Sequence, residues 1–176
     1  MRFLILFLFL FISGCATLSE SECIHGDWFE IGQTDGRNGY KSSRVEKHSK
    51  ACQKTNTNVD FDAYMQGRKD GLKYYCSPQN GFDSGLEGSY YNKVCPIELE
   101  REFLEYYSYG KEIYIVNNEI SSVENEMDQK ERELEDDDTT DEERRYLRKD
   151  IKYLIKDLRR LNRELINLEQ RYNDLL

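Results

Sequence analysis

The sequence predicts a mainly α-helical protein, in which a small disulfide-linked three-helix domain is followed by a long antiparallel helical hairpin, a coiled coil. Three observations predict this fold class. Glycines recur in pairs four residues apart in the first half of the chain, and all five cysteines lie before residue 96. Apolar residues of the last 30 positions recur at alternating steps of four and three, which is typical of a coiled-coil seam.

The first 14 residues predict an export signal. A basic Arg2 precedes an apolar run over residues 3–12, which is too short to cross a bilayer, since a spanning helix takes about 20 residues. The following Ile12-Ser13-Gly14-Cys15 is typical of a bacterial lipobox, in which the cysteine thiol takes the lipid. We expect a lipoprotein signal peptide over residues 1–14 and a lipidated tether over 15–22, with fatty acyl chains such as palmitate on Cys15. An ordinary signal peptide with an incidental cysteine is the alternative.

Charge and hydropathy limit the partners of the exported chain. Cleavage removes Arg2 and leaves 24 basic residues against 34 acids, so we expect no nucleic-acid partner and no attraction to anionic lipid. Membrane association is then expected through the acyl anchor. Alanine at position 16, by analogy with enteric bacteria, favours the outer membrane facing the periplasm. A mean hydropathy of −0.82 and a single long apolar run exclude a polytopic membrane protein.

The cysteines that remain after lipidation predict two disulfides. They are four in number, and an even number in an exported protein is typical of disulfide bonding: Cys23, Cys52, Cys76 and Cys95. The alternative is a zinc site built from Cys23, His25, His48 and Cys52, but its spacing fits no common zinc pattern. We expect neither a metal nor a cofactor, and we expect the two histidines to be ordinary surface or packing residues.

Paired glycines predict three helices in the Gly/Cys-rich domain of residues 23–95. Glycines at i and i+4 line one helix face and let another helix approach closely, although each costs about 1 kcal/mol in helix propensity. The pairs are Gly32 with Gly36, Gly67 with Gly71, and Gly81 with Gly85. Hairpin turns at the two Asp-Gly sequences are the alternative. We predict helices at 27–50, 60–75 and 80–93.

An up-down-up arrangement of these three helices predicts the disulfide pairing. Cys23 precedes the first helix and Cys76 follows the second, so both would lie at one pole of the domain. Cys52 and Cys95 follow the first and third helices and would lie at the other pole. The predicted disulfides are therefore Cys23–Cys76 and Cys52–Cys95.

Known catalytic patterns do not occur in the sequence, so we expect no enzyme and no catalytic residue. The chain contains no P-loop, no EF-hand loop and no Gly-x-Ser-x-Gly turn, and after disulfide formation no cysteine would be left as a nucleophile. Asp35, Asp70 and Asp83 could in principle serve glycosidase chemistry, but their spacing does not support it. We interpret them as solvated helix positions.

The cysteine and glycine pattern resembles a known family. It comprises the lipobox, Cys23…Trp28-x3-Gly32-x2-Asp35-Gly36-x2-Gly39, His48-x3-Cys52, Tyr64-x2-Gly67-x3-Gly71-Leu72-x-Tyr74-Tyr75-Cys76, and Gly85-x2-Gly88-x-Tyr90-x3-Val94-Cys95-Pro96. Over residues 15–115 this is similar to the bacterial lipoproteins of the domain of unknown function 2799 family. The resemblance implies no activity and no catalytic residue, and it leaves the charged C-terminal part uncovered.

Residues 96–176 predict the antiparallel coiled-coil hairpin. A polar break at residues 135–143 separates two apolar seams, and Thr140 with Glu143 forms a capping box at the start of the second arm. The seams match when Tyr106 lies opposite Leu168 and, further along, Phe103 opposite Tyr172, Ile113 opposite Leu161 and Ile120 opposite Leu154. Residues 98–143 hold 18 acids and 4 bases, whereas residues 144–176 hold 10 bases and 5 acids, which favours antiparallel pairing. Pairing between chains, giving a homo-oligomer, is the alternative.

These features predict a lipid-anchored periplasmic protein of the cell envelope with a structural or interaction role. The hairpin would be a stiff rod that binds an unidentified envelope protein. The alternative is a binding module, in which the 13 tyrosines and the glycine-rich surface of residues 23–95 bind a glycan or a small apolar ligand.

Overall fold

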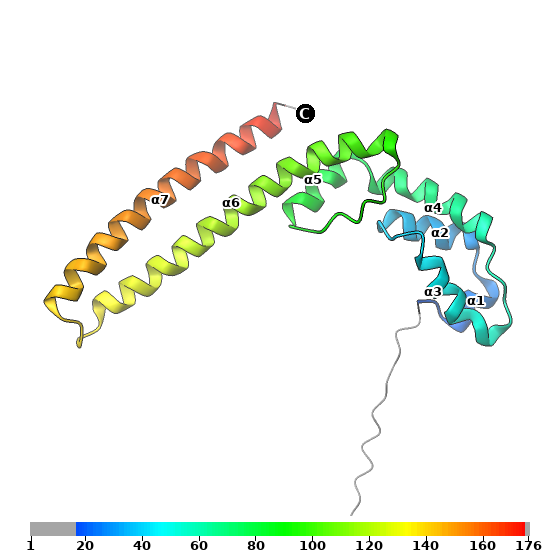
Figure 1. Cartoon of the computed structure of the whole chain (residues 1–176), viewed down its shortest axis with the longest axis horizontal. Coiled ribbons are helices and arrows are strands. Elements are labelled where there is room, and N and C mark those ends of the chain that lie inside the picture. The colour runs from blue at the N-terminus through cyan, green and yellow to red at the C-terminus, as the bar shows by residue number, and fades with distance from the viewer. Residues whose placement is uncertain (1–16, 175–176) are drawn as a thin grey trace, which may run out of the picture.

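The computed structural model describes residues 17–174, and every regular element in this part of the chain is helical. Figure 1 shows an elongated, bent molecule, in which α6 and α7 form a rod and the short helices gather at the other end (Figure 1). The elements are α1 (Glu20–His25), α2 (Trp28–Arg37), α3 (Arg44–Ala51), the 3-10 helix η1 (Cys52–Thr55), α4 (Phe61–Tyr75), α5 (Pro78–Leu86), α6 (Ile97–Glu135) and α7 (Asp141–Asn173). The predicted helical class, with a disulfide-linked domain and two long antiparallel helices, is confirmed. The signal peptide and Cys15 lie outside the described residues.

Two predicted helices are shorter than expected, and each ends near a glycine with a left-handed backbone. The helix predicted over 27–50 stops at Arg37, where Gly39 has φ 64°, and the chain turns before α3 begins. The helix predicted over 80–93 stops at Leu86, shortly before Gly88 with φ 71°. Such φ values are easily adopted only by glycine, so the glycines at these two positions favour the turns that end both helices.

Glycines bring α2 and α4 into direct backbone contact. A Cβ atom added at Gly32 would lie 2.0 Å from the carbonyl oxygen of Tyr64, and one added at Gly67 would lie 1.9 Å from that of Phe29. Gly36 and Gly71 meet the opposite backbone in the same way. The predicted close approach of glycine-lined helices is therefore present, and neither helix tolerates a side chain at these positions.

The same arrangement occurs a second time between α5 and α6. A Cβ atom at Gly85 would lie 2.2 Å from the carbonyl oxygen of Tyr107, and one at Gly110 would lie 2.2 Å from that of Phe82. Gly36 of α2 thus corresponds to Gly85 of α5, and Gly71 of α4 to Gly110 of α6. The turns that follow α2 and α5 also correspond, because the ring of Tyr75 covers Gly39 in the first and the ring of Tyr114 covers Gly88 in the second.

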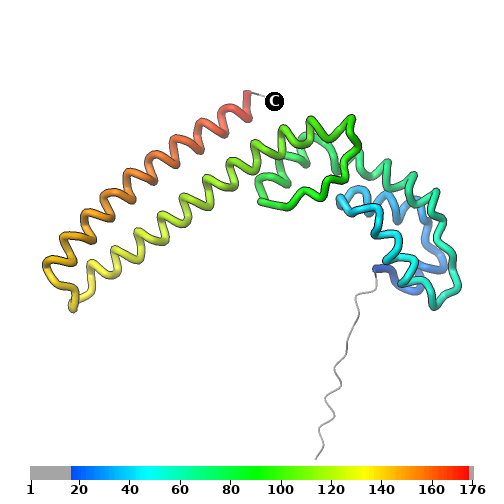
Figure 2. The backbone as a smooth tube through the Cα atoms, viewed as in Figure 1, coloured from blue at the N-terminus to red at the C-terminus, as the bar shows by residue number. Residues whose placement is uncertain are grey.

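The chain therefore contains two copies of one structural unit. Each unit consists of a cysteine, a helix, a second cysteine and a partner helix. The first unit comprises Cys23, α2, Cys52 and α4, and the second comprises Cys76, α5, Cys95 and α6. Figure 2 shows the two helix pairs following one another along the tube (Figure 2).

The disulfides lie within the units, not between them. Cys23 pairs with Cys52 and Cys76 pairs with Cys95, so the two predicted disulfides exist but the predicted pairing was wrong. The error follows from the first predicted helix. Because the chain reverses after Arg37, α3 returns Cys52 to the side of Cys23 and not to the far pole. The same bond removes both thiols of the alternative zinc site.

The rod is held by an apolar seam between α6 and α7. Its most buried members are Ile113, Val116, Leu161 and Leu168. Tyr106 meets Tyr172 edge to face, one helical turn beyond the predicted Leu168. Phe103 does not face Tyr172 as predicted, because it lies among Tyr75, Tyr91 and Tyr107 of the helical domain.

The turn between α6 and α7 has the predicted helix cap, and Arg144 makes further hydrogen bonds across it. Thr140 and Glu143 form the capping box at the start of α7. The guanidinium group of Arg144 donates hydrogen bonds to the backbone carbonyls of Leu134, Asp136 and Thr139. The bond to Leu134 satisfies a carbonyl in the last turn of α6 that has no partner within the helix, and the bonds to Asp136 and Thr139 hold the loop that follows.

Residues 17–22, which belong to the segment expected to be a tether, are part of the fold. Leu18 is buried beside Cys23, Val45 and Tyr64, and α1 starts at Glu20. The domain division at residue 96 stays a prediction, and the packing of α5 on α6 crosses it. Among the described residues, no helix is long and apolar enough to cross a membrane.

Candidate functional site

A buried carboxylate forms the centre of the first unit. Asp35 of α2 is 5% exposed, and both of its carboxylate oxygens are bonded. Oδ2 accepts a hydrogen bond of 2.7 Å from the hydroxyl of Tyr64 and lies 2.8 Å from Nε2 of His48. Oδ1 accepts a bond of 3.1 Å from Nε of Arg44. A buried charge is stable only when it is paired in this way.

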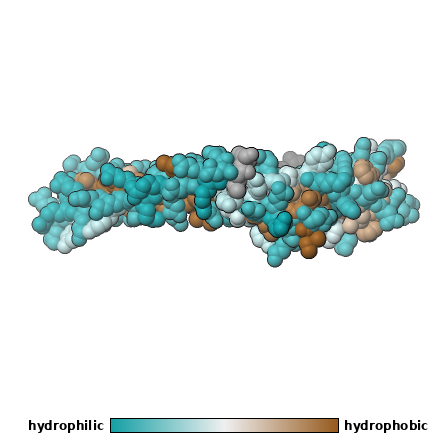
Figure 3. All heavy atoms as spheres, turned by 90° about the horizontal axis from the view of Figure 1, so that it is seen from above, coloured by the Kyte–Doolittle hydropathy of each residue, from teal (hydrophilic) through white to brown (hydrophobic). Residues whose placement is uncertain are grey.

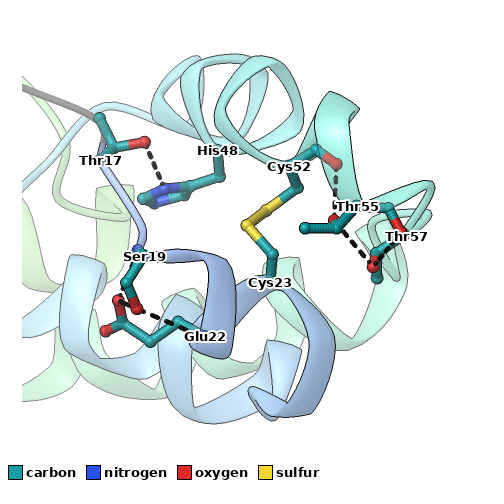
Figure 4. The surroundings of a disulfide bond; sticks show 8 residues. All are labelled: Thr17, Ser19, Glu22, Cys23, His48, Cys52, Thr55 and Thr57. Carbon is teal, nitrogen blue, oxygen red and sulfur yellow. Dashed lines mark hydrogen bonds between the residues drawn. A yellow bond between two sulfur atoms is a disulfide. The ribbon is translucent and has the colours of Figure 1, made fainter. Parts of the chain in front are cut away.

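His48 connects Asp35 to the N-terminal segment. Its ring is 1% exposed, and Nδ1 lies 2.9 Å from the hydroxyl oxygen of Thr17. Because Nε2 faces a carboxylate, we assign a proton to Nε2, from which Asp35 accepts a hydrogen bond, while Nδ1 lies within hydrogen-bond distance of the Thr17 hydroxyl. Figure 4 shows Thr17 and His48 pointing toward one another beside the Cys23–Cys52 disulfide (Figure 4).

The helices place these groups through the glycine contact. Asp35 lies between Gly32 and Gly36, so α4 approaches closely enough for Tyr64 to reach it. One turn further along α4, the buried Arg68 donates two bonds, of 3.0 and 2.7 Å, to the carbonyl oxygen of Tyr40. Arg68 thereby fixes the turn that leads into α3 and so positions His48.

Burial and hydrogen bonding shift the ionisation of the site in opposite directions. Burial alone would raise the pKa of Asp35, but hydrogen bonds from His48 and Tyr64 together with neighbouring positive charge outweigh it and lower the pKa. Burial, followed by the bond to Asp35, raises the pKa of Tyr64. Burial lowers the pKa of Arg68. At neutral pH the site therefore holds an ionised Asp35 and a neutral Tyr64.

The second unit shows that the architecture does not require this polar network. Phe103 occupies in the second unit the place of Tyr64 in the first, and both side chains are 0% exposed. Ser84 occupies the place of Asp35. The hydroxyl of Tyr107 donates to the carbonyl oxygen of Ser89, as Arg68 does to that of Tyr40. An apolar and aromatic core thus supports the same helix pair, so the network of Asp35, His48, Tyr64 and Arg44 has a role specific to the first unit.

The network opens on a depression of about 410 Å³ at the surface, which Thr17, Glu22, Asp27, Glu30, Arg44 and His48 help to line. Within residues 17–174 no group of histidine, cysteine and carboxylate side chains is arranged to hold a metal ion. Both oxygens of Asp35 and both ring nitrogens of His48 have protein partners. The geometry therefore favours holding the Thr17 segment over activating a bound substrate.

The sequence prediction treated Asp35 as a solvated position, and this was wrong. Asp70 is partly exposed and bonds to Gln33 and Lys73, and Asp83 accepts a bond from Gln79, so the three aspartates do not converge on one site. His25 is exposed, whereas His48 is buried and bonded. The available signal was a polar Asp between two helix-packing glycines, a place where α4 would cover it.

Comparison with known proteins identifies the region that contains both units. Neither the curated proteins nor the solved structures compared with the chain include a match. A family model described as "Protein of unknown function (DUF2799)" matches residues 27–112. The match begins just before α2 and ends just after Gly110, so it covers both glycine-packed helix pairs. Residues 27–112 of the chain are therefore a domain of the DUF2799 family.

Proposed function

We propose that the protein is a lipid-anchored structural or interaction protein of the bacterial cell envelope, without catalytic activity. In this proposal the DUF2799 domain lies at the periplasmic face of the outer membrane, attached through acylated Cys15. The rod of α6 and α7 reaches away from it and contacts an envelope protein.

The observation that carries the proposal is the length and surface of the rod. The 39 residues of α6 and the 33 of α7 correspond to about 58 and 50 Å at 1.5 Å per residue. The rod's mutual seam is satisfied within the chain, yet further apolar side chains on it are exposed: Ile115, Tyr146, Tyr153, Ile155 and Ile166. Figure 3 shows scattered hydrophobic residues on an otherwise hydrophilic face (Figure 3). Exposed apolar side chains along paired helices suit the binding of a partner helix.

A groove between the two helices adds to this support. It measures about 490 Å³, and its apolar side chains are Ile115, Val116 and Leu168. Its rim carries both signs of charge, with Glu112 and Glu119 from α6 and Arg160, Arg163 and Arg171 from α7. An apolar floor within a charged rim is the composition of many protein–protein contacts.

Two features support export and anchoring. Disulfides form and persist in oxidising compartments, and this chain has two. The lipobox sequence supplies an acceptor cysteine two residues before the first described residue. The absence of catalytic activity is supported by the closed hydrogen bonding of Asp35 and His48.

The alternative binding module has less support. Its glycines would have to form an open surface, but those in α2, α4 and α5 are covered by the backbone of a partner helix. Exposed tyrosines do occur in the domain, notably Tyr74 and Tyr90.

Site-specific photocrosslinking in intact cells tests the proposal. A benzophenone amino acid would replace Tyr153 or Ile166 on the rod, Tyr90 on the domain, or the exposed polar Ser122 of α6 as a matched control. We expect one discrete crosslinked protein from the two apolar rod positions and none from Ser122. Discrete crosslinks only from Tyr90, or to glycan strands, would contradict the rod and favour the binding module.

A further inference from the structure

The lipid anchor has almost no free chain between it and the folded domain. This step rests on the proposed acylation of Cys15. Successive Cα atoms are about 3.8 Å apart, so the Cα of Cys15 lies within about 8 Å of that of Thr17. Thr17 bonds to buried His48, and Leu18 packs in the core. The anchor therefore holds this end of the domain against the lipid headgroups.

The element packed on the anchor segment is basic, in a chain that is acidic. Residues 41–55, which comprise α3, η1 and the turn before them, contain five of the 25 basic residues and one of the 34 acids. This segment contacts the start of the fold at three places. His48 meets Thr17, Val45 packs with Leu18, and Cys52 bonds to Cys23.

Four lysines of this segment are exposed: Lys41, Lys47, Lys50 and Lys54. We call them the α3 lysine surface. None of them forms an ion pair with another residue in the described range 17–174, whereas Arg44 is bonded to Asp35. Unpaired lysines beside an acyl anchor have the chemistry that recognises anionic headgroups.

We propose that the α3 lysine surface lies on an anionic phospholipid membrane and orients the anchored protein. The network of Asp35, His48 and Thr17 fixes α3 to the anchor segment, which gives it a role that the second unit does not share. The acidic arm of residues 98–143, with 18 acids and 4 bases, is repelled by the same surface. Attraction at α3 and repulsion along α6 together point the rod away from the membrane.

The test uses the full lipidated protein in vesicles. The native cysteines are bonded or acylated, so Ser43→Cys offers one thiol for a fluorophore at the start of α3, where the serine side chain makes no cap hydrogen bond. Ser122→Cys places the same probe on the rod. Vesicles of phosphatidylcholine, alone or with about 30% phosphatidylglycerol, carry a quencher on the headgroup. Flotation reports anchoring separately from quenching.

We expect quenching at residue 43 and not at 122, stronger with phosphatidylglycerol and weakened at about 0.5 M salt. An anionic surface favours each nearby lysine by about fivefold in partitioning, so Lys47→Glu with Lys50→Glu should remove the extra quenching that phosphatidylglycerol produces at 43, while the protein still floats. Lys152→Glu with Arg159→Glu makes the same charge change on α7 and should have no effect.

Three results would overturn the inference in distinguishable ways. Failure to float would refute the anchoring in the proposed function, and the inference with it. Flotation with equal quenching at 43 and 122 would refute the orientation alone. Quenching at 43 that is independent of phosphatidylglycerol and of the two lysines would show that the anchor alone sets the distance.

Discussion

The ring of Phe82 in α5 stacks on the ring of Tyr172 in α7, with the centroids 3.6 Å apart and the planes 9° from parallel. The contact joins the end of the rod to the second unit of the DUF2799 domain. Tyr172 also meets Tyr106 of α6, so the last turns of α7 lie against two helices. The rod is thus fixed at its base as well as along its seam.

Replacing Tyr172 should therefore loosen the base of the rod without melting it. Tyr172→Ala removes both ring contacts, and aromatic pairs of this kind contribute about 0.5–1.5 kcal/mol beyond their burial. We expect faster hydrogen exchange over residues 165–174 and unchanged protection around Leu161. Tyr153→Ala, at an exposed tyrosine on the same helix, is the control and should leave exchange unaltered. Equal protection in the two variants would contradict a fixed base.

Gly67→Ala should destabilise the first unit, although alanine favours a helix over glycine by about 1 kcal/mol. The added Cβ would lie 1.9 Å from the carbonyl oxygen of Phe29, which is backbone and cannot rotate away. The helices must separate, and overpacking of this kind costs about 1–3 kcal/mol net. Urea unfolding followed by circular dichroism measures the loss. Gln66→Ala, at an exposed neighbouring position, is the control. Equal stability of the Gly67→Ala and Gln66→Ala variants would refute the close packing.

Acid should destabilise the protein through Asp35. Its folded-state pKa is lowered by hydrogen bonds and positive charge that outweigh burial. The carboxylate therefore contributes stability above the pKa of the unfolded chain, about 3.9 for an aspartate, and loses it as the pH falls through the lower folded value. Asp35→Asn should lower stability at pH 7 and reduce the fall in the free energy of unfolding below about pH 5. Asp62→Asn, at an exposed position on α4, should retain the wild-type dependence, and an unchanged slope in Asp35→Asn would contradict the assignment.

The sequence predicted the glycine faces and the rod because both depend on local periodicity. The disulfide pairing failed because it depended on whether one helix continued past Gly39, and a single left-handed residue reversed the chain. A comparison within the sequence could have corrected it. Residues 32–39 and 81–88 share the pattern Gly-x3-Gly-x2-Gly, and Gly71 and Gly110 each precede a tyrosine by four residues. Two equal units would place one disulfide in each.

The buried hydrogen-bond network of Asp35 could not be predicted from the sequence for a different reason. The position of Asp35 between Gly32 and Gly36 could indicate that α4 covers it, but nothing in the local sequence names the groups that bond to its carboxylate. Its environment is created by His48 and Tyr64, which arrive from α3 and α4 only after the helices pack. The basic segment around α3 was likewise missed, because the negative net charge of the whole chain does not show how charge is distributed over the surface.

Leu161→Asp should unfold the rod but leave the DUF2799 domain folded, and it therefore tests where the boundary between the two lies. Leu161 is 1% exposed in the seam, and a buried unpaired charge costs several kcal/mol. We expect α7 and the distal half of α6 to lose protection from hydrogen exchange. The first part of α6 should keep its protection, because Gly110 packs it against α5 and the Cys76–Cys95 disulfide closes the same unit. Glu164→Lys, an exposed change on the same helix, is the control. Loss of protection throughout residues 78–112 would show that the second unit needs α7 as its third helix, and that the rod is part of the domain's core.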